Sequence, residues 1–222
     1  MEWSNEKPWF VAIGASGAHG LDDIKQLLHA LPTATPAVVL LVLHRPWDRL
    51  SNLRAVLAPA SRMPVVIAAD GERFEAGMVY IGGPADHLTL AAKSFGALVA
   101  DPDREYRNRT VDLLFHSVAE HGGRRSIGVI LSGALDDGAR GLADVHHAGG
   151  LTMVLTPLGG SPVGMPENAI AYGGAIDLTG NPLQIAQAIE AAINAQPPNR
   201  LPAAAARRPA RNRSARRPPR PA

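Results

Sequence analysis

The sequence predicts an α/β fold, in which a single doubly wound, mainly parallel β-sheet carries helices on both faces. Short apolar runs alternate with amphipathic stretches along the chain, and this alternation is typical of consecutive βαβ units. The run at 37–43 is apolar throughout, as expected of a strand that helices cover on both faces. The chain has 222 residues, 46% of them hydrophobic, which suffices for one domain with a sizeable core.

The N-terminal half contributes strands and helices in alternation. In order these are a strand at 9–13, a helix through Ile24, Leu27, Leu28 and Leu31, the strand at 37–43, a helix through Leu50, Leu53 and Leu57, and two short strands at 64–68 and 78–81. The helices are predicted from apolar residues that recur at helical spacing, and the strands from continuous apolar runs. Asp70 and Gly71 predict a turn between the two short strands.

The C-terminal half continues the pattern. It supplies a helix through Val111, Leu114, Phe115 and Val118, a buried strand at 127–131, a helix from about Ala139, a strand at 151–155 and a last helix at 183–195. Gly149 and Gly150 are suited to end the helix that begins near Ala139. Together the elements predict one domain over 9–195, preceded by an N-terminal extension at 1–8.

The C-terminal segment 196–222 differs in composition from the rest of the chain. It consists mainly of Pro, Ala and Arg without apolar periodicity, which predicts a disordered tail. Residues 200–222 hold eight arginines and no acid, whereas 1–199 hold fourteen Lys and Arg against twenty Asp and Glu, a net charge of −6. Two interpretations of the tail stay open: a solvated low-complexity segment, or an element that binds an acidic partner, anionic lipid or nucleic acid. The lack of aromatic residues in the tail disfavours nucleic acid.

Several classes of protein are excluded by composition. Cysteine is absent, so the chain has no disulfide and no thiolate nucleophile or metal ligand. Its apolar runs are too short to cross a bilayer, and its first residues lack the apolar core of a signal peptide. We therefore expect a cytoplasmic protein with no membrane span. We also expect no metal site, because adjacent histidines such as His146 and His147 face different directions on a helix. No cofactor is expected either.

Three reactive residues directly follow predicted strands. Ser16 and His44 come after the first and second long strands, and Asp137 comes shortly after the strand at 127–131. Because the carboxyl ends of parallel strands meet at one edge of a sheet, we expect these side chains to lie together. A serine hydroxyl needs a base to remove its proton, and the base needs an acid to fix its tautomer. The pattern therefore favours a nucleophilic triad.

Each member of this trio also has a purely structural interpretation. Ser16 is suited to cap the helix that follows it, although the free N–H groups of that helix are equally suited to hold an oxyanion. His44 fits a hydrogen-bonded histidine at the start of a loop. Asp136 or Asp137 fits the N-cap position of the next helix.

The residues around these positions form short motifs in a fixed order. They are Gly14-Ala15-Ser16, His44-Arg45-Pro46, the segments 70–73, 80–84, 111–119 and 132–138, and Gly164-Met165-Pro166. Over about 10–193, this order and spacing resembles the methylesterase domain of CheB-type chemotaxis proteins, the protein-glutamate methylesterases. The resemblance implies the fold of that C-terminal domain. It also implies that Ser16, His44 and Asp137 are the catalytic residues.

The resemblance further implies a reaction and its partners. The expected activity is hydrolysis of glutamate γ-methyl esters on methyl-accepting chemoreceptors or related signalling proteins, with glutamine deamidation as a second activity. In this scheme Ser16 attacks the ester carbonyl, His44 serves as base and then as acid for the methanol leaving group, and Asp137 orients His44. Family members commonly carry a receiver domain. Only about nine residues precede the first predicted strand here, so we expect no such domain. The enzyme is then expected either to work without phosphorylation or to be controlled by a separate regulatory protein.

Four further residues are candidates for the substrate pocket or the oxyanion site. Gly17 and His19 lie in a segment with one residue more than the family pattern. Ala134 stands where the family carries a methionine, and Met165 lies in the Gly-Met-Pro motif. These departures affect the pocket walls rather than the fold.

Two other functions are compatible with the sequence. Glycines at 14, 17 and 20 after a strand resemble the phosphate-binding loop of a nicotinamide-dependent reductase, but the Tyr-x-x-x-Lys pair of many short-chain reductases is absent. The alternative is a non-catalytic binding module that kept the fold after its pocket changed. Covalent labelling of Ser16 distinguishes an active serine from an inert one.

Overall fold

The computed structural model describes residues 7–44, 52–83, 86–101, 103, 105–106, 108–157, 159 and 163–195. The predicted Arg-rich tail lies outside these residues, as do Leu50 and most of the predicted N-terminal extension. The division of the chain into an extension, a domain at 9–195 and a tail therefore stays a prediction. None of the described helices is long and apolar enough to span a bilayer.

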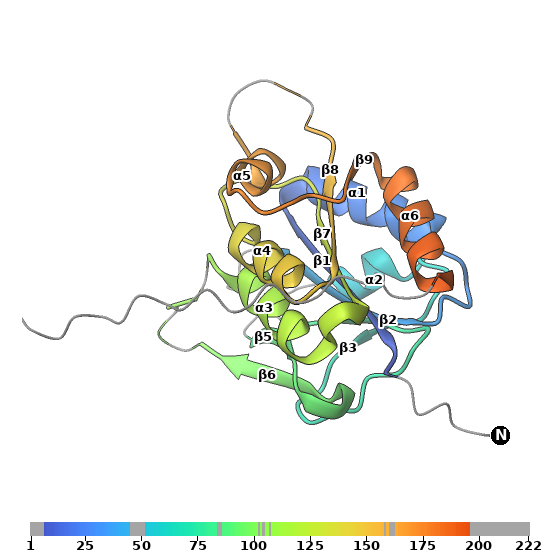
Figure 1. The fold of residues 1–222 in the computed structure, drawn as a ribbon. Helices are drawn as coiled ribbons and strands as arrows, with labels where there is room; N and C mark the ends of the chain where they lie inside the picture. The colour runs from blue at the N-terminus through green and yellow to red at the C-terminus, as the bar shows by residue number, and fades with distance from the viewer. Residues whose placement is uncertain are drawn as a thin grey trace, which may run out of the picture.

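A seven-stranded parallel sheet forms the centre of the molecule (Figure 1). Its order is β3-β4-β2-β1-β7-β8-β9, and every neighbouring pair is parallel. The strands are β1 (Trp9–Ser16), β2 (Ala37–His44), β3 (Val65–Ile67), β4 (Val79–Ile81), β7 (Ser126–Ile130), β8 (Leu151–Leu155) and β9 (Leu178–Gly180). The predicted fold class is confirmed.

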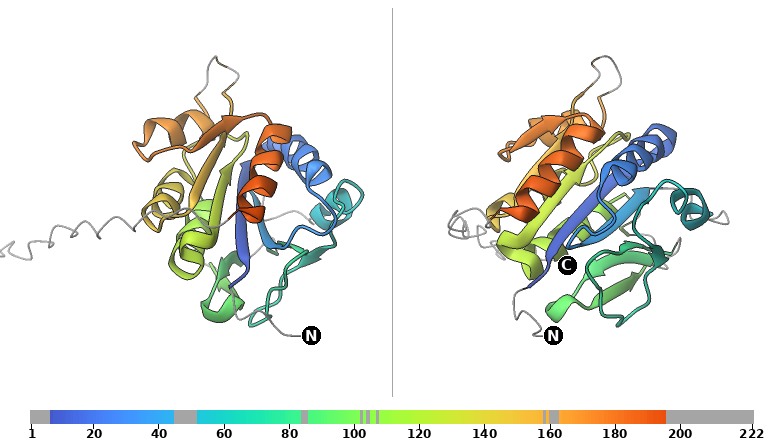
Figure 2. Two further views of the ribbon diagram at one scale, coloured as in Figure 1. Left: turned by 45° about the vertical axis from the view of Figure 1, so that its right-hand side comes forward. Right: turned by 90° about the vertical axis from the view of Figure 1, so that its right-hand side faces the viewer.

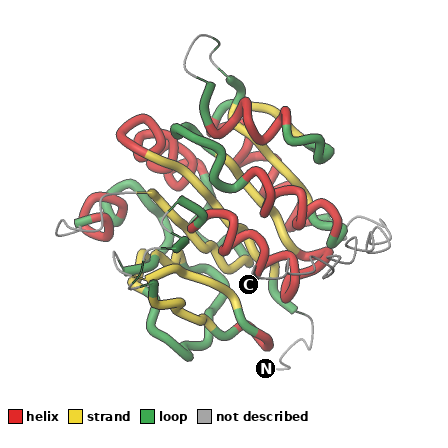
Figure 3. Tube along the Cα trace, turned by 90° about the vertical axis from the view of Figure 1, so that its left-hand side faces the viewer, coloured by secondary structure: helices red, strands yellow, loops and turns green. Residues whose placement is uncertain are grey.

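Helices cover both faces of this sheet (Figure 2). One face carries α1 (Gly17–Ala30), α2 (Leu53–Leu57) and α6 (Pro182–Asn194). The other carries α3 (Thr110–Gly122), α4 (Ala139–His147) and α5 (Met165–Ala171), which Figure 3 shows from their own side. Short 3-10 turns lie at Ala92–Ser94 and Gly123–Arg125.

The continuous apolar runs of β1 and β2 follow from this two-sided burial. In β1, Trp9, Val11 and Ile13 belong to the core under α1 and α6, whereas Phe10 and Ala12 belong to the core under α3. Residues alternate in the same way along β2. Because side chains of a strand point to opposite faces in turn, these central strands are apolar up to their carboxyl ends, where the polar residues Ser16 and His44 stand.

Three strands and one helix of the described residues were not predicted from the sequence. An antiparallel hairpin joins β5 (Asp86–Leu90) to β6 (Gly96–Ala100), and α5 and β9 complete the C-terminal part. The hairpin buries polar residues of β5. His87 Nε2 lies 3.1 Å from Asp101 Oδ2, and the Thr89 hydroxyl donates to the Ala97 carbonyl. These tertiary partners are not visible in an apolar pattern.

Candidate active site

Ser16 and His44 are direct neighbours at the carboxyl ends of two adjacent strands. Ser16 ends β1 and His44 ends β2, and the two residues are partners in the parallel register. Register partners on neighbouring parallel strands point to the same face, and such strands lie about 4.8 Å apart. By the same alternation, both residues belong to the face that α3 covers. Strand pairing therefore brings a hydroxyl and an imidazole together.

Two glycines allow α3 to pack closely over this end of β1. A Cβ on Gly14, two residues before Ser16, would overlap the side chain of Val111, and so would a Cβ on Gly138. Val111 is the second residue of α3. The N-terminus of α3 therefore lies over the end of β1, close to Ser16.

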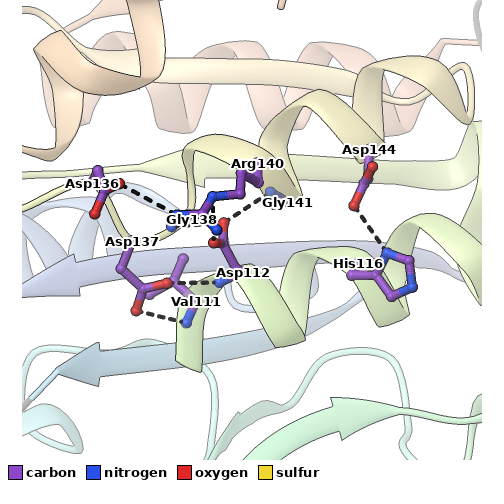
Figure 4. A network of polar contacts seen from close by, with 9 residues as sticks. All are labelled: Val111, Asp112, His116, Asp136, Asp137, Gly138, Arg140, Gly141 and Asp144. Atoms are coloured by element: carbon purple, nitrogen blue, oxygen red, sulfur yellow. Dashed lines mark hydrogen bonds and ion pairs between the residues drawn. The ribbon is translucent and has the colours of Figure 1, made fainter. Parts of the chain in front are cut away.

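The first turn of α3 binds the carboxylate of Asp137 (Figure 4). Asp137 Oδ2 accepts a hydrogen bond from the N–H of Val111 at 3.0 Å, and Oδ1 accepts one from the N–H of Asp112 at 2.9 Å. Asp137 is only 3% exposed. Unpaired N–H groups and the helix dipole make the start of a helix favourable for a negative charge. Helix α3 thereby holds Asp137 at the edge of the sheet where Ser16 and His44 lie.

The structure contradicts two of the capping interpretations. Gly138, and neither aspartate, occupies the N-cap position of α4. The side chain of Asp136 is exposed and pairs with Arg140, with Nη2 3.5 Å from Oδ2. Ser16 does occupy the N-cap position of α1, but its hydroxyl makes no capping hydrogen bond there. The Ser16 hydroxyl is therefore not committed to holding α1.

Burial raises the pKa of Asp137 above its ordinary value. The two N–H hydrogen bonds act in the opposite direction, the negative charge of Asp112 adds to the rise, and the charge of His44 lowers it. The last effect places the imidazole within electrostatic range of the carboxylate. Within the described residues no hydrogen bond joins the three side chains, and catalytic hydrogen bonds often shorten only when substrate binds.

The raised pKa of Asp137 predicts a specific dependence of stability on pH. A carboxyl whose pKa is higher in the folded state favours folding most below its unfolded pKa, and this contribution is lost as pH rises through the folded pKa. We expect the melting temperature of wild type, relative to that of Asp137→Asn, to fall as pH rises above about 4, the ordinary pKa of an aspartate. Thermal melts of both proteins across this range measure the difference. A difference that grows with pH would show that the hydrogen bonds to α3 outweigh burial.

The loop after β7 packs against the junction of β1 and α1. The N–H of Ser16 donates to the carbonyl of Ser132 at 2.9 Å, and the N–H of Ser132 donates to Asp23 Oδ2 at 3.2 Å. A Cβ on Gly20 would overlap the Ser132 carbonyl, so only glycine leaves room for it. The N–H of Ser16 is thereby occupied. The amide groups available beside its hydroxyl are those of residues 17–19, which lack partners within the helix.

Gly17 and His19 both lie in the first turn of α1. His19 therefore lies in a helix and not in a loop, because β1 continues to Ser16 and α1 begins at once. The His19 side chain is exposed. Gly17 has φ 72°, a backbone conformation that favours glycine. The sharp change of direction at Gly17 presents the first N–H groups of α1 at the end of β1.

Met165 lies next to Ser16. It is buried, and its N–H donates to the carbonyl of Gly133 at 2.8 Å. A Cβ on Gly133 would overlap the Met165 sulfur and crowd the side chain of Ser16. Gly133 is therefore a site residue that was not predicted from the sequence. Its position directly before Ala134, a predicted pocket residue, could have indicated it.

Ala134 and Leu135 form the outer part of this loop. Ala134 is exposed and pairs with Gly164 in an isolated antiparallel bridge. Leu135 is 52% exposed and has φ 71°, which is rare for a leucine. Its carbonyl accepts a hydrogen bond from Asn168 Nδ2 at 2.7 Å, which ties the loop to α5. The large apolar side chain of this loop is therefore Leu135, one position after Ala134.

The backbone at Leu135 predicts a gain in stability on substitution by glycine. A left-handed conformation costs a non-glycine residue about 1–2 kcal/mol, and glycine loses about 0.5–1 kcal/mol through its larger unfolded-state entropy. We expect Leu135→Gly to raise the melting temperature by roughly 1–4 °C. Leu135→Ala keeps the strained backbone and serves as the control in the same thermal melts. An equal rise for both variants would assign the gain to lost apolar surface instead.

Comparison with known proteins connects this site to a family. The family model described as CheB methylesterase matches residues 11–189. The protein-glutamate methylesterase/protein-glutamine glutaminase of Pectobacterium atrosepticum is 37% identical over 195 residues, which cover 86% of this chain and 54% of that protein. A protein of the same name from Bordetella avium is 36% identical over 178 residues, covering 80% and 52%. The chain thus spans about half the length of the curated relatives it matches.

A solved structure supports the same assignment. The CheB methylesterase catalytic domain of Thermotoga maritima superposes with a TM-score of 0.74 at 27% sequence identity, covering 84% of this chain and 99% of that one. The match therefore covers the sheet together with both helical layers. In agreement with the motif order noted above, the chain belongs to the CheB methylesterase family.

Proposed function

We propose that this chain is a carboxylic ester hydrolase that removes methyl groups from glutamate γ-methyl esters of chemoreceptors in chemotaxis-type signalling. The observation that carries the proposal is the register pairing of Ser16 with His44, next to a buried Asp137 held by α3. The names of the relatives supply the substrate class, a glutamate ester or glutamine amide within a protein. Deamidation of glutamine is the second proposed activity.

The proposed reaction has two halves. Ser16 Oγ attacks the ester carbonyl while His44 removes its proton, and the oxyanion that forms is held by N–H groups of the first turn of α1. His44 then gives the proton to the departing methoxide, which leaves as methanol. A water molecule attacks the acyl-enzyme with His44 again as base, and the glutamate carboxylate is released. For glutamine the leaving group is ammonia.

Asp137 supports His44 in this scheme. Its carboxylate fixes the imidazole tautomer and stabilises the imidazolium that forms in each half-reaction. Burying a carboxyl group that must ionise is unfavourable, and a protein that only binds a partner has no need of it. The buried Asp137 therefore favours an enzyme over the non-catalytic binding module. Membership of the methylesterase family removes the basis for the nicotinamide-dependent reductase.

The direct test is methanol release from a receptor that carries glutamate methyl esters. Wild-type protein should release methanol from the methylated receptor, and ammonia from a receptor with glutamine at the same positions. An unmethylated, glutamate-bearing receptor is the control and should yield neither product. Absence of both products with every receptor would reject the proposed function. A separate regulatory protein, an acidic partner for the tail and a cytoplasmic location stay predictions.

A further inference from the structure

Helices α3 and α4 bind each other's aspartates at their N-termini (Figure 4). Asp137, which lies just before α4, accepts two hydrogen bonds from the first turn of α3. Asp112, in the first turn of α3, accepts two in return: its Oδ1 receives the N–H of Gly138 at 3.0 Å and that of Gly141 at 2.9 Å. We call this pair of carboxylates, Asp112 and Asp137, the reciprocal cap.

Neither helix has a cap of its own. The N-cap residue of α3 is Arg109 and that of α4 is Gly138, and neither makes a side-chain capping hydrogen bond. The four orphan N–H groups at a helix start need acceptors, and in each of these helices the reciprocal cap accepts two N–H groups of the helix start. The Asp112 carboxylate lies mostly within the protein, with 13% of its side chain exposed.

The reciprocal cap fixes the backbone on the C-terminal side of Asp137. Gly138 follows Asp137 directly, has φ 97°, and packs against Val111. Two parts of this segment are therefore bound to α3. The Asp137 side chain accepts N–H groups of α3, and the next backbone N–H, that of Gly138, donates to Asp112. A shift of Gly138 would move Asp137 away from His44.

A third group limits the electrostatic cost of the arrangement. Asp112 and Asp137 repel each other, which contributes to the raised pKa of Asp137. Arg140, in the first turn of α4, places Nε 3.8 Å from Asp112 Oδ2. Its guanidinium therefore offsets the negative charge on the outer side of Asp112 and leaves Oδ1 to the two N–H groups.

We propose that Asp112 is a positioning residue for the reaction: by accepting the N–H groups of Gly138 and Gly141, it holds Asp137 in the place from which it orients His44. This inference rests on the proposed function. Asp112 does not contact the reacting atoms in this scheme and acts only through the loop that carries Asp137.

The test compares two substitutions at this position. Asp112→Asn keeps an oxygen that accepts both N–H groups, so we expect kcat within about threefold of wild type. Asp112→Ala removes the acceptor, and we expect kcat to fall on the order of 10–100-fold with KM within about twofold, because misplacement of a catalytic group by about 1 Å has this effect. Amide hydrogen exchange at Gly138 and Gly141 should accelerate in the alanine variant only.

The matched control is Asn181→Ala in α6, on the opposite face of the sheet. Asn181 Oδ1 caps α6 by accepting the N–H of Gln184 at 2.9 Å, so its loss removes a helix cap on the other face of the sheet, at the end of β9, which two strands separate from β1. We expect it to lower stability without lowering kcat. Any of three results would overturn the positioning role. The first is a kcat for Asp112→Ala within about threefold of wild type, and the second is an Asp112→Asn variant as impaired as Asp112→Ala. The third is an equal loss of kcat in Asn181→Ala.

Fluorophosphonate labelling of Ser16 separates failure of this inference from failure of the proposed function. The label reports activation of the serine without depending on the natural ester, and its rate should follow the same order as kcat in the three variants. Labelled wild-type protein that hydrolyses no methyl ester would reject the substrate class, while the labelling rates still decide the role of Asp112. Wild-type protein that neither labels nor hydrolyses would reject the proposed function and the positioning role together.

Discussion

Ser16→Ala should lower methanol release by at least about 10³-fold. The reason is that alanine has no hydroxyl to form the acyl-enzyme, and the remaining site offers only binding and oxyanion stabilisation. His44→Ala should cost about as much, because the hydroxyl then loses the base that its register partner provides. Initial rates at saturating substrate, measured well below the melting temperature of each variant, give these ratios.

The double variant is the sharper part of this prediction. Residues that act as one unit show strongly non-additive losses, so Ser16→Ala combined with His44→Ala should be little worse than either change alone. Losses that multiply would argue against a shared step. His116→Ala is a matched control for the histidine, since His116 is exposed on α3 and pairs with Asp144 at 2.9 Å. It should retain wild-type turnover.

Asp137→Asn is expected to reduce kcat on the order of 10³–10⁴-fold. An asparagine cannot stabilise the imidazolium, and its amide favours the wrong tautomer of His44. Asp136→Asn should stay within a few-fold of wild type, because Asp136 is exposed and pairs with Arg140. The two variants differ by one position and carry the same chemical change, so each serves as the control for the other.

The opposite ranking of these two variants would have a clear meaning. Activity that survives Asp137→Asn and disappears with Asp136→Asn would show that the residue that orients His44 lies one position earlier. The buried hydrogen bonds of Asp137 to α3 would then be purely structural.

The central strands were predictable because their environment is uniform. A strand buried on both faces is mainly apolar, and β1, β2, β7 and β8 each begin and end within three residues of the predicted ranges. The hairpin of β5 and β6 was missed because His87 and Thr89 are buried against polar partners rather than apolar ones. Helix α5 was missed because Met165-Pro166 suggested a turn, whereas proline is well accommodated in a first helical turn.

The site was predictable only in part. The rule that reactive residues gather at the carboxyl ends of parallel strands located Ser16 and His44, since strand register alone places them together. How Asp137 is held was not predictable, because it depends on the close approach of α3 to β1 over Gly14. Asp112 gave no signal at all: in the sequence it resembles an ordinary acidic residue at the start of a helix.

Covalent labelling of wild-type protein by a fluorophosphonate, followed by peptide mass spectrometry, tests most directly whether Ser16 is an activated nucleophile. We predict a single phosphonyl adduct on the peptide that contains Ser16, no adduct in Ser16→Ala, and much slower labelling in His44→Ala and Asp137→Asn. Wild-type protein that remains unlabelled, or that carries the label on another serine such as Ser132, would contradict it.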